Sequence, residues 1–130
     1  MNQGRVLVVE DDPSIRMLIR MVLEARGLDV AEAEDGSSAH PLARAFRPDL
    51  VLLDVGLPGI DGLAVLELLK EDAELCDVPV VMVTAWAEAE VMATAVARGA
   101  HGYLRKPFEI DDLCRCVDDA LSASLAAAAA

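Results

Sequence analysis

The chain has 130 residues, which suits one domain with a single hydrophobic core and leaves no room for two. Hydrophobic residues make up 55% of it and charged residues 26%, which excludes a disordered chain. The 11 basic and 23 acidic residues give a formal net charge of -12, which repels nucleic-acid backbones and anionic membrane surfaces. We therefore expect neither direct nucleic-acid binding nor membrane association.

Cysteine usage and the lack of export signals point to a reducing compartment. Cys76, Cys114 and Cys116 cannot all pair, and the last two lie two residues apart on a predicted helix, where side chains point to different faces. The sequence has neither a run of about 18 apolar residues nor a signal-peptide pattern. We expect a cytoplasmic domain over residues 1–123, with residues 124–130 as an alanine-rich tail: a helix extension, a linker or an expression remnant.

Five short β-type runs alternate with helical patterns, which is the sequence form of repeated βα units around a parallel sheet covered on both faces. In chain order the runs are Val6–Val9, Asp29–Ala33, Leu50–Leu53, Val80–Val83 and Gly102–Leu104. The third is wholly apolar and the fourth is rich in β-branched residues, as expected of central strands. The second and fifth are weaker, so we place them at the edges.

The first two helices are predicted from caps and breakers. The first begins at Pro13, with Asp12 as its cap, and ends at Gly27. Its apolar residues recur at helical spacing: Ile15, Leu18, Ile19, Val22 and Leu23. We start the second near Ser38, which keeps Pro41 within the tolerated first turn.

The other three helices are predicted from apolar residues at helical spacing. Those of the third are Leu63, Leu66, Leu68 and Leu69. Those of the fourth, which ends at Gly99, are Val91, Ala95 and Val96. Those of the fifth are Leu113, Cys116, Val117, Ala120 and Leu121.

Polar residues follow four of the five strands. Glu10 and Asp11 come after the first, Asp54 after the third, Thr84 after the fourth and Lys106 after the fifth. The carboxyl ends of parallel strands share one edge of the sheet, which is where ligands bind. Each residue alone has a plainer interpretation, such as a solvated loop, a turn or a strand terminator. Together they predict one site with the hard oxygen ligands that Mg²⁺ prefers.

Four motifs carry a resemblance to a known family. They are Val-Val-Glu-Asp-Asp, Leu-Leu-Asp-Val-Gly-Leu-Pro-Gly-Ile-Asp-Gly, Val-Thr-Ala and Gly-Tyr-Leu-Arg-Lys-Pro-Phe, which follow or surround the first, third, fourth and fifth strands. From residue 5 to about 121 the chain resembles the receiver domain of two-component response regulators, the CheY-like family. The resemblance implies an α/β, flavodoxin-like, doubly wound fold: a five-stranded parallel sheet of order 2-1-3-4-5 with helices on both faces.

That strand order places the third strand between the first and the fourth. Because adjacent strands lie about 4.8 Å apart, we expect Asp11 and Thr84 on either side of Asp54. The fifth strand lies two strands from Asp54, roughly 10 Å, a distance that the long stem of Lys106 can cover. The carboxylates of Glu10, Asp11 and Asp54, with one divalent cation and one ammonium, would leave the site near neutral.

The resemblance implies a chemistry for these acids. Asp54 would accept a phosphoryl group from a sensor histidine kinase or a phosphotransfer protein, in a reaction that depends on Mg²⁺. Glu10, Asp11, Asp54 and the backbone carbonyl of Gly56 would hold the ion. Hydrolysis of the acyl phosphate would reset the site, so we expect a signalling domain rather than an enzyme that acts on other substrates.

The resemblance also implies how the signal leaves the site. Thr84, the Ala85 amide and Lys106 would bind phosphoryl oxygens, and Thr84 with Tyr103 would form the switch to a surface made by the fourth helix and the fifth strand and helix. The alternative for Tyr103 is a ring packed permanently against the fourth helix. The receiving partner would be a downstream protein or a tethered output domain. A homodimer stays open.

Several residues depart from the family pattern or stay ambiguous. Gly56 has no side chain to influence the attacking water, which leaves the phosphate lifetime open. Trp86 either hinders access to the site or is an exposed loop aromatic. His101 and Gly102 stand where regulators resembling OmpR often have acids that bridge dimers, which puts that dimer mode in doubt. His40 and His101 are interpreted as surface residues.

Three alternative functions would each require residues or losses that the sequence does not have. Haloacid-dehalogenase phosphatases carry a second acid two residues after the nucleophile, where this chain has Gly56. A flavin or nucleotide module needs a Gly/Ser/Thr phosphate loop after the first strand, where this chain has Glu10-Asp11-Asp12. A degenerate receiver that acts only through phosphorylation-independent protein contacts requires the loss of a site residue, and the motifs are complete.

Overall fold

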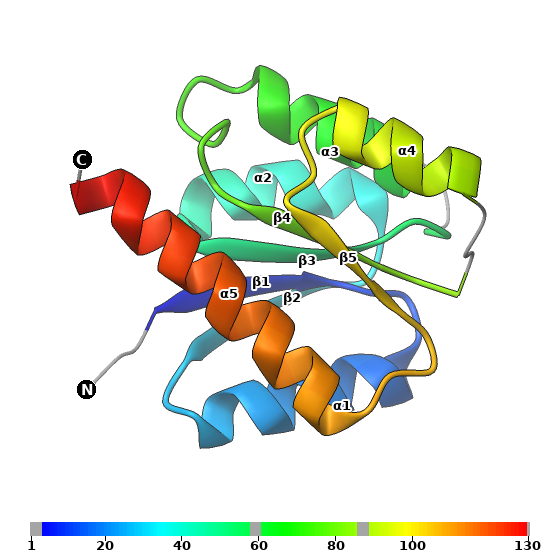
Figure 1. The fold of residues 1–130 in the computed structure, drawn as a ribbon, viewed down its shortest axis with the longest axis vertical. Helices are drawn as coiled ribbons and strands as arrows, with labels where there is room; N and C mark the ends of the chain where they lie inside the picture. The colour runs from blue at the N-terminus through cyan, green and yellow to red at the C-terminus, as the bar shows by residue number, and fades with distance from the viewer. Residues whose placement is uncertain (1–3, 58–60, 86–88, 130) are drawn as a thin grey trace.

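The structure, a computed structural model, describes residues 4–57, 61–85 and 89–129. Strands and helices alternate along this part of the chain (Figure 1). The strands are β1 (Arg5–Val9), β2 (Asp29–Ala33), β3 (Leu50–Asp54), β4 (Val80–Thr84) and β5 (Gly102–Arg105). The helices are α1 (Pro13–Ala25), α2 (Gly36–Phe46), α3 (Gly62–Glu71), α4 (Ala89–Ala97) and α5 (Ile110–Ala129).

The strands form one parallel sheet of order β2-β1-β3-β4-β5, so the predicted order and the predicted edge strands are confirmed. Helices α1 and α5 cover one face of the sheet, and α2, α3 and α4 cover the other (Figure 1). This is the doubly wound, flavodoxin-like architecture expected from the motifs. The strand order reverses at β1 and β3, whose carboxyl ends lie side by side.

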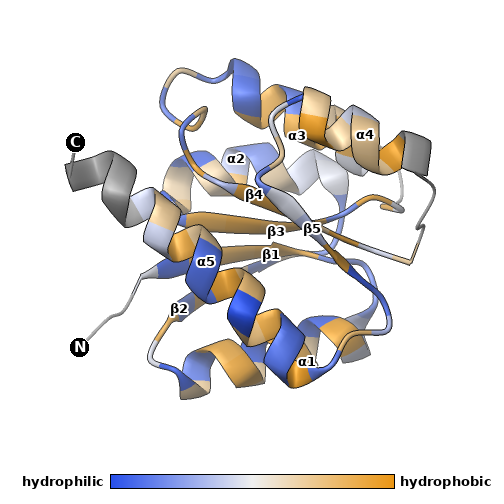
Figure 2. Cartoon of the chain, in the orientation of Figure 1, coloured by the Kyte–Doolittle hydropathy of each residue, from blue (hydrophilic) through white to orange (hydrophobic). Residues whose placement is uncertain are grey.

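The core has two layers because successive residues of a strand point to opposite faces of the sheet. Leu7 and Val9 belong to the layer under α2, α3 and α4, whereas Val6 and Val8 belong to the layer under α1 and α5. In Figure 2 the central strands are orange, while blue, hydrophilic residues lie on the helices. A strand that is covered on both faces must be apolar throughout, as Leu50–Leu53 is.

Helix α1 starts and ends where its caps predict. The Asp12 side chain accepts hydrogen bonds from the backbone N–H groups of Ser14 (2.8 Å) and Ile15 (3.3 Å), and Pro13 occupies the first helical position. Gly27 follows the helix with a φ of 84°, a left-handed conformation that glycine adopts without a steric penalty.

Helix α2 begins earlier than predicted, at Gly36, so Pro41 lies inside it rather than in its first turn. Asp35 caps the helix by accepting hydrogen bonds from the Ser38 N–H (2.9 Å) and the Ser38 hydroxyl (2.6 Å). Small residues on its inner face, Gly36, Ala39 and Ala43, are buried. The Asp35 cap and this burial stabilise a helical turn before Ser38, which the position of Pro41 alone did not predict.

Smaller corrections concern three apolar residues and two strand ends. Leu18, Leu68 and Val96, all predicted to face the core, are 41%, 37% and 56% exposed, because their helices bury narrower stripes than the spacing predicts. Asp54 and Thr84 are the last residues of β3 and β4 rather than the first residues after them. Their side chains therefore keep strand geometry, which fixes their direction at the edge of the sheet.

Helix α5 continues through residues 124–129. Within the described ranges, the helices are too short or too polar to cross a membrane.

Candidate functional site

Four strands bring the predicted site residues to one edge of the sheet. The register pairs Val9 of β1 with Leu53 of β3 and Asp54 of β3 with Val83 of β4, so these strands end nearly level. Thr84, the last residue of β4, is level with Arg105, the residue before Lys106. The doubly wound topology therefore collects side chains that are up to 96 residues apart in the sequence, from Glu10 to Lys106.

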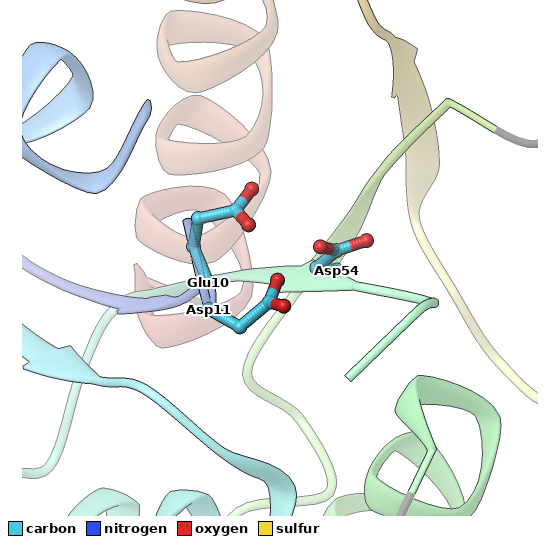
Figure 3. A group of neighbouring side chains, drawn as sticks. All are labelled: Glu10, Asp11 and Asp54. Carbon is cyan, nitrogen blue, oxygen red and sulfur yellow. The ribbon is translucent and has the colours of Figure 1, made fainter. Parts of the chain in front are cut away.

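The carboxylates of Glu10, Asp11 and Asp54 gather at the ends of β1 and β3 (Figure 3). One oxygen from each lies within 4.8 Å of the others. Glu10 and Asp54 are buried, with 2% and 6% of their surface exposed, whereas Asp11 is exposed. Three acids this close repel one another unless cations compensate for their charge.

Lys106 supplies one compensating charge. Its Nζ lies 2.5 Å from Glu10 Oε1 and 3.2 Å from Asp54 Oδ2, and its side chain is only 14% exposed. Its backbone N–H donates to the Thr84 carbonyl at 2.8 Å, which fixes the start of the loop after β5. The stem of Lys106 thus crosses the width of β4 to reach β3, as its length predicts.

Backbone groups orient the acids further. Asp54 Oδ1 accepts a hydrogen bond from the Gly56 N–H at 3.1 Å, so its other oxygen is the one that meets Lys106. Glu10 Oε2 accepts from the Asp12 N–H at 3.1 Å. Both bonds place a backbone donor against a carboxylate oxygen, which fixes how each carboxylate is turned.

Burial and neighbouring charge shift the proton affinities at the site. Burial raises the pKa of Glu10 to about 7, and the nearby Asp54 charge adds to this, against the opposing effects of Lys106 and the Asp12 amide. Burial alone would lower the pKa of Lys106, but its contacts with Glu10 and Asp54 raise it overall. The ammonium therefore stays charged, and three carboxylates against one ammonium leave a net charge of about -2 when all are ionised.

Two residues that sequence reasoning did not single out shape the site. A Cβ added at Gly62, the first residue of α3, would lie 2.1 Å from the Asp54 carbonyl oxygen, so only glycine fits behind the acid. Arg16 of α1 donates from Nη1 to the Glu10 carbonyl at 2.8 Å. In the sequence Gly62 is only the last residue of a motif, and nothing in the helical pattern sets Arg16 apart from other polar residues of α1.

The remaining predicted residues lie around the same edge. Thr84 is buried, and Ala85 and Gly56 are exposed beside it and beside Asp54. Tyr103 on β5 is 55% exposed, so its ring is not buried against α4. Trp86 lies outside the described residues.

An apolar cavity of about 300 Å³ adjoins the site. It lies between α1 and the loop after β5, and its lining residues are Ile15, Leu18, Ala85, Lys106, Pro107 and Phe108. Ala85 and Lys106 belong to both regions, so the polar site borders an apolar surface.

The comparisons with known proteins agree with this geometry. A family profile described as the response regulator receiver domain matches residues 6–118. Over 109 residues the chain is 45% identical to the phosphate regulon transcriptional regulatory protein PhoB of Klebsiella pneumoniae, covering 84% of this chain and 48% of that protein. It is 42% identical to the DNA-binding response regulator MtrA of Mycolicibacterium smegmatis, covering 84% and 46%. The chain thus spans less than half the length of these relatives.

Among solved structures, the receiver domain of the sensor histidine kinase PA1611 from Pseudomonas aeruginosa is similar, with a TM-score of 0.84 and 28% identity. The alignment covers 92% of this chain and 98% of that one, whose structure holds a magnesium ion in the active-site cleft. The family match covers most of the chain and agrees with its strand order and its edge of polar residues. This chain belongs to the response regulator receiver domain family, a signalling domain of two-component systems.

Proposed function

We propose that Asp54 accepts a phosphoryl group from a phosphohistidine and that the modified domain changes its partner-binding surface. One observation carries the proposal: the Asp54 carboxylate is buried between a backbone amide and an ammonium, beside two further acids. An Asp54 oxygen would attack the phosphorus as the P–N bond of the donor breaks, and its electron pair would return to the imidazole nitrogen. The product would be an acyl phosphate on Asp54 and a neutral donor histidine.

The residues at the site fit a Mg²⁺ ion. Three carboxylates offer oxygens within 4.8 Å of one another, and the described residues give the buried Glu10 Oε1 an ion pair but no hydrogen bond of suitable geometry. Glu10, Asp11, Asp54 and the Gly56 carbonyl would hold the ion, which supplies charge neutralisation of the transferring oxygens. The related PA1611 receiver domain, which binds magnesium in its cleft, supports this assignment.

The cations and donors of this chain would hold the phosphoryl group once it is attached. Lys106 already contacts Asp54 Oδ2, so a small displacement would let its ammonium meet a phosphoryl oxygen instead. The Thr84 hydroxyl and the Ala85 amide would bind other oxygens. Attack of water on the acyl phosphate would reset the site, and Gly56 places no side chain in its path.

Movement of Thr84 toward the phosphoryl group would transmit the change to Tyr103. The ring of Tyr103 is exposed on β5, and an inward turn of this ring would change the surface that β5 shares with α4 and α5. The partners would be a sensor histidine kinase or phosphotransfer protein on the input side, with a downstream protein, a tethered output domain or a second copy on the output side. We place this exchange in the cytoplasm. Because the domain is acidic, we propose that it does not itself bind nucleic acid; the DNA binding named for MtrA is a property of that longer protein.

The test is phosphorylation by a small acyl phosphate, such as acetyl phosphate, with and without Mg²⁺. We expect the intact mass to increase by one phosphoryl group only when Mg²⁺ is present, and we expect no increase in Asp54→Asn. Label that persists in Asp54→Asn would move the acceptor elsewhere. A wild-type chain that neither binds Mg²⁺ nor takes up phosphate would instead support a phosphorylation-independent interaction module.

A further inference from the structure

Arg16 of α1 contacts the acidic site through the backbone. Its Nη1 donates a hydrogen bond to the Glu10 carbonyl at 2.8 Å, and its side chain is 17% exposed. The bond joins a charged donor to a main-chain oxygen, a pairing stronger than a neutral one. Arg16 is outside the set of acids, amide, hydroxyl and ammonium to which the proposed function assigns the chemistry.

The carbonyl that Arg16 holds belongs to the peptide unit between Glu10 and Asp11. On the other side of Glu10, its N–H donates to the Ala33 carbonyl of β2 at 3.0 Å. The Glu10 backbone is therefore fixed at both its N–H and its C=O, one by the sheet and the other by a side chain. Fixing that peptide plane sets the directions in which both acids leave the chain.

The Arg16 guanidinium also lies near the carboxylate of Glu32. Arg16 Nε lies 3.8 Å from Glu32 Oε1, and Glu32 Oε2 lies 2.8 Å from Arg20 Nη1. A polar cavity of about 360 Å³, lined in part by Arg16 and Glu32, adjoins this pair. The ion pair is long and open to the cavity, so it contributes little stability by itself. The bond to the Glu10 carbonyl is the shorter of the two Arg16 contacts.

We propose that Arg16 is a positioning residue, which holds the Glu10–Asp11 peptide so that both carboxylates face Asp54. The role of this positioning rests on the proposed function, but the orientation of the Glu10–Asp11 peptide can be measured in the protein without metal. Groups that orient ligands in this way typically change metal affinity by about 10-fold to 100-fold when they are removed. Because Arg16 holds a backbone carbonyl and not a ligand atom, we expect the lower end of that range.

The test compares Arg16→Met with Arg26→Met in the full chain. Methionine keeps most of the apolar stem of arginine and removes the donors, and Arg26 lies at the far end of α1, where it pairs with Asp118. We expect Arg16→Met to weaken Mn²⁺ binding, followed by electron paramagnetic resonance, roughly tenfold, with Arg26→Met unchanged. Saturating Mg²⁺ should restore the limiting rate of phosphorylation by acetyl phosphate, because the reacting groups are intact.

Two further readouts separate positioning from general destabilisation. The carbonyl ¹³C resonance of Glu10 in the metal-free protein should shift in Arg16→Met and not in Arg26→Met. Arg16→Lys, which retains a charged donor, should recover part of the Mn²⁺ affinity. Wild-type Mn²⁺ affinity in Arg16→Met would overturn the inference, as would an unmoved Glu10 resonance or equal losses in both methionine variants.

The outcomes also distinguish this inference from the proposed function. If the wild-type chain binds Mn²⁺ but takes no phosphoryl group, the proposed function fails while the Mn²⁺ titration still decides the role of Arg16. If Asp54 is phosphorylated normally and Arg16→Met binds Mn²⁺ like the wild type, only the inference fails. A wild-type chain that binds no Mn²⁺ overturns both.

Discussion

Two carboxylate clusters in this molecule differ in their charge balance. At the ends of β1 and β3, Glu10, Asp11 and Asp54 meet one ammonium, that of Lys106. Between α2 and α3, the carboxylate of Asp72 meets two basic groups: its Oδ2 lies 2.9 Å from His40 Nε2 and 2.7 Å from Arg44 Nη1. Acids are in excess in the first cluster, whereas in the second Asp72 and Glu74 are matched by Arg44 and Arg47, with His40 beside them.

The pKa values of Asp72 and Glu10 shift in opposite directions. Hydrogen bonds from His40, the Glu74 amide and Arg44 lower the pKa of Asp72 to about 2, so this carboxylate is fully ionised and fully partnered. Burial, with the nearby Asp54 charge, raises the pKa of Glu10 to about 7, so this carboxyl takes up a proton far more readily than Asp72 does. The difference between the clusters is that the carboxylate of Asp72 joins α2 to the end of α3 through basic partners, whereas the acids at the ends of β1 and β3 outnumber theirs, as the proposed cation site requires.

Replacing Lys106 by alanine removes the ammonium from the acidic cluster, and we expect the largest effect there. Asp54 should still be phosphorylated, since the acids that would hold Mg²⁺ remain. The conformational response should be lost, because no ammonium would link β5 to the phosphoryl group. Intact mass would follow phosphorylation, and the fluorescence of Trp86, the single tryptophan, would follow the response to Mg²⁺ with beryllofluoride or acetyl phosphate.

Lys70→Ala is the matched control, because Lys70 is the other lysine of the chain. Its Nζ donates to the carbonyls of Cys76 (3.0 Å) and Val78 (2.9 Å) and does not touch the site. We expect Lys70→Ala to lower stability and keep the fluorescence response. A full response in Lys106→Ala would remove Lys106 from the mechanism.

Gly62→Ala tests whether the acidic cluster depends on close backbone packing as well as on charge. The added Cβ would lie 2.1 Å from the Asp54 carbonyl oxygen, so α3 or the end of β3 must move. We expect a loss of about 3 kcal/mol in the free energy of unfolding, measured with urea. Gly102→Ala is the control, since a Cβ there meets nothing within 4 Å. Equal stability of the two variants would show that the loop before α3 yields without cost.

The sequence predicts most of the fold because the signals are local. Alternating short apolar runs and helical stripes locate every strand and helix, and the predicted strands begin or end within one residue of the observed ones. The predicted start of α2 was wrong because it was placed from the position of Pro41 alone. That placement ignores the Asp35 cap and the buried face of the helix, both of which stabilise the earlier start. In α2 the burial of the inner face outweighs the low helix propensity of proline.

The parts of the site that the sequence does not predict depend on close approaches between separate helices and strands. Gly62 is required by the Asp54 carbonyl eight residues before it, and Arg16 reaches Glu10 only because α1 packs beside the end of β1. His40 was expected to be a plain surface residue, yet it pairs with Asp72, 32 residues away. Such contacts follow from the packing of helices, which spacing alone does not determine.

Asp11→Asn removes one charge from the acidic cluster while keeping its shape, so it tests the idea that the surplus of acid binds the cation. We expect Mg²⁺ affinity, measured by calorimetry, to fall roughly tenfold, or about 1.4 kcal/mol. Asp72→Asn removes a similar charge from the other cluster and should leave Mg²⁺ affinity unchanged. If both variants lost affinity equally, the net charge of the domain and not the local cluster would govern binding.

The smallest effect concerns acid stability and the Asp72 cluster. The pKa of Asp72 is lowered from 3.8 to about 2 in the folded chain, so folding favours the ionised carboxylate. Its contribution is complete above about pH 4 and disappears as the pH falls toward 2, because the proton then binds more tightly to the unfolded chain. Urea unfolding of wild type and Asp72→Asn across this range isolates the contribution from that of the other carboxylates. The two free-energy curves should converge as the pH drops, since the variant has no charge to lose there. Parallel curves would mean that His40 and Arg44 do not favour the ionised form, and the contrast between the two clusters would then rest on the acidic site alone.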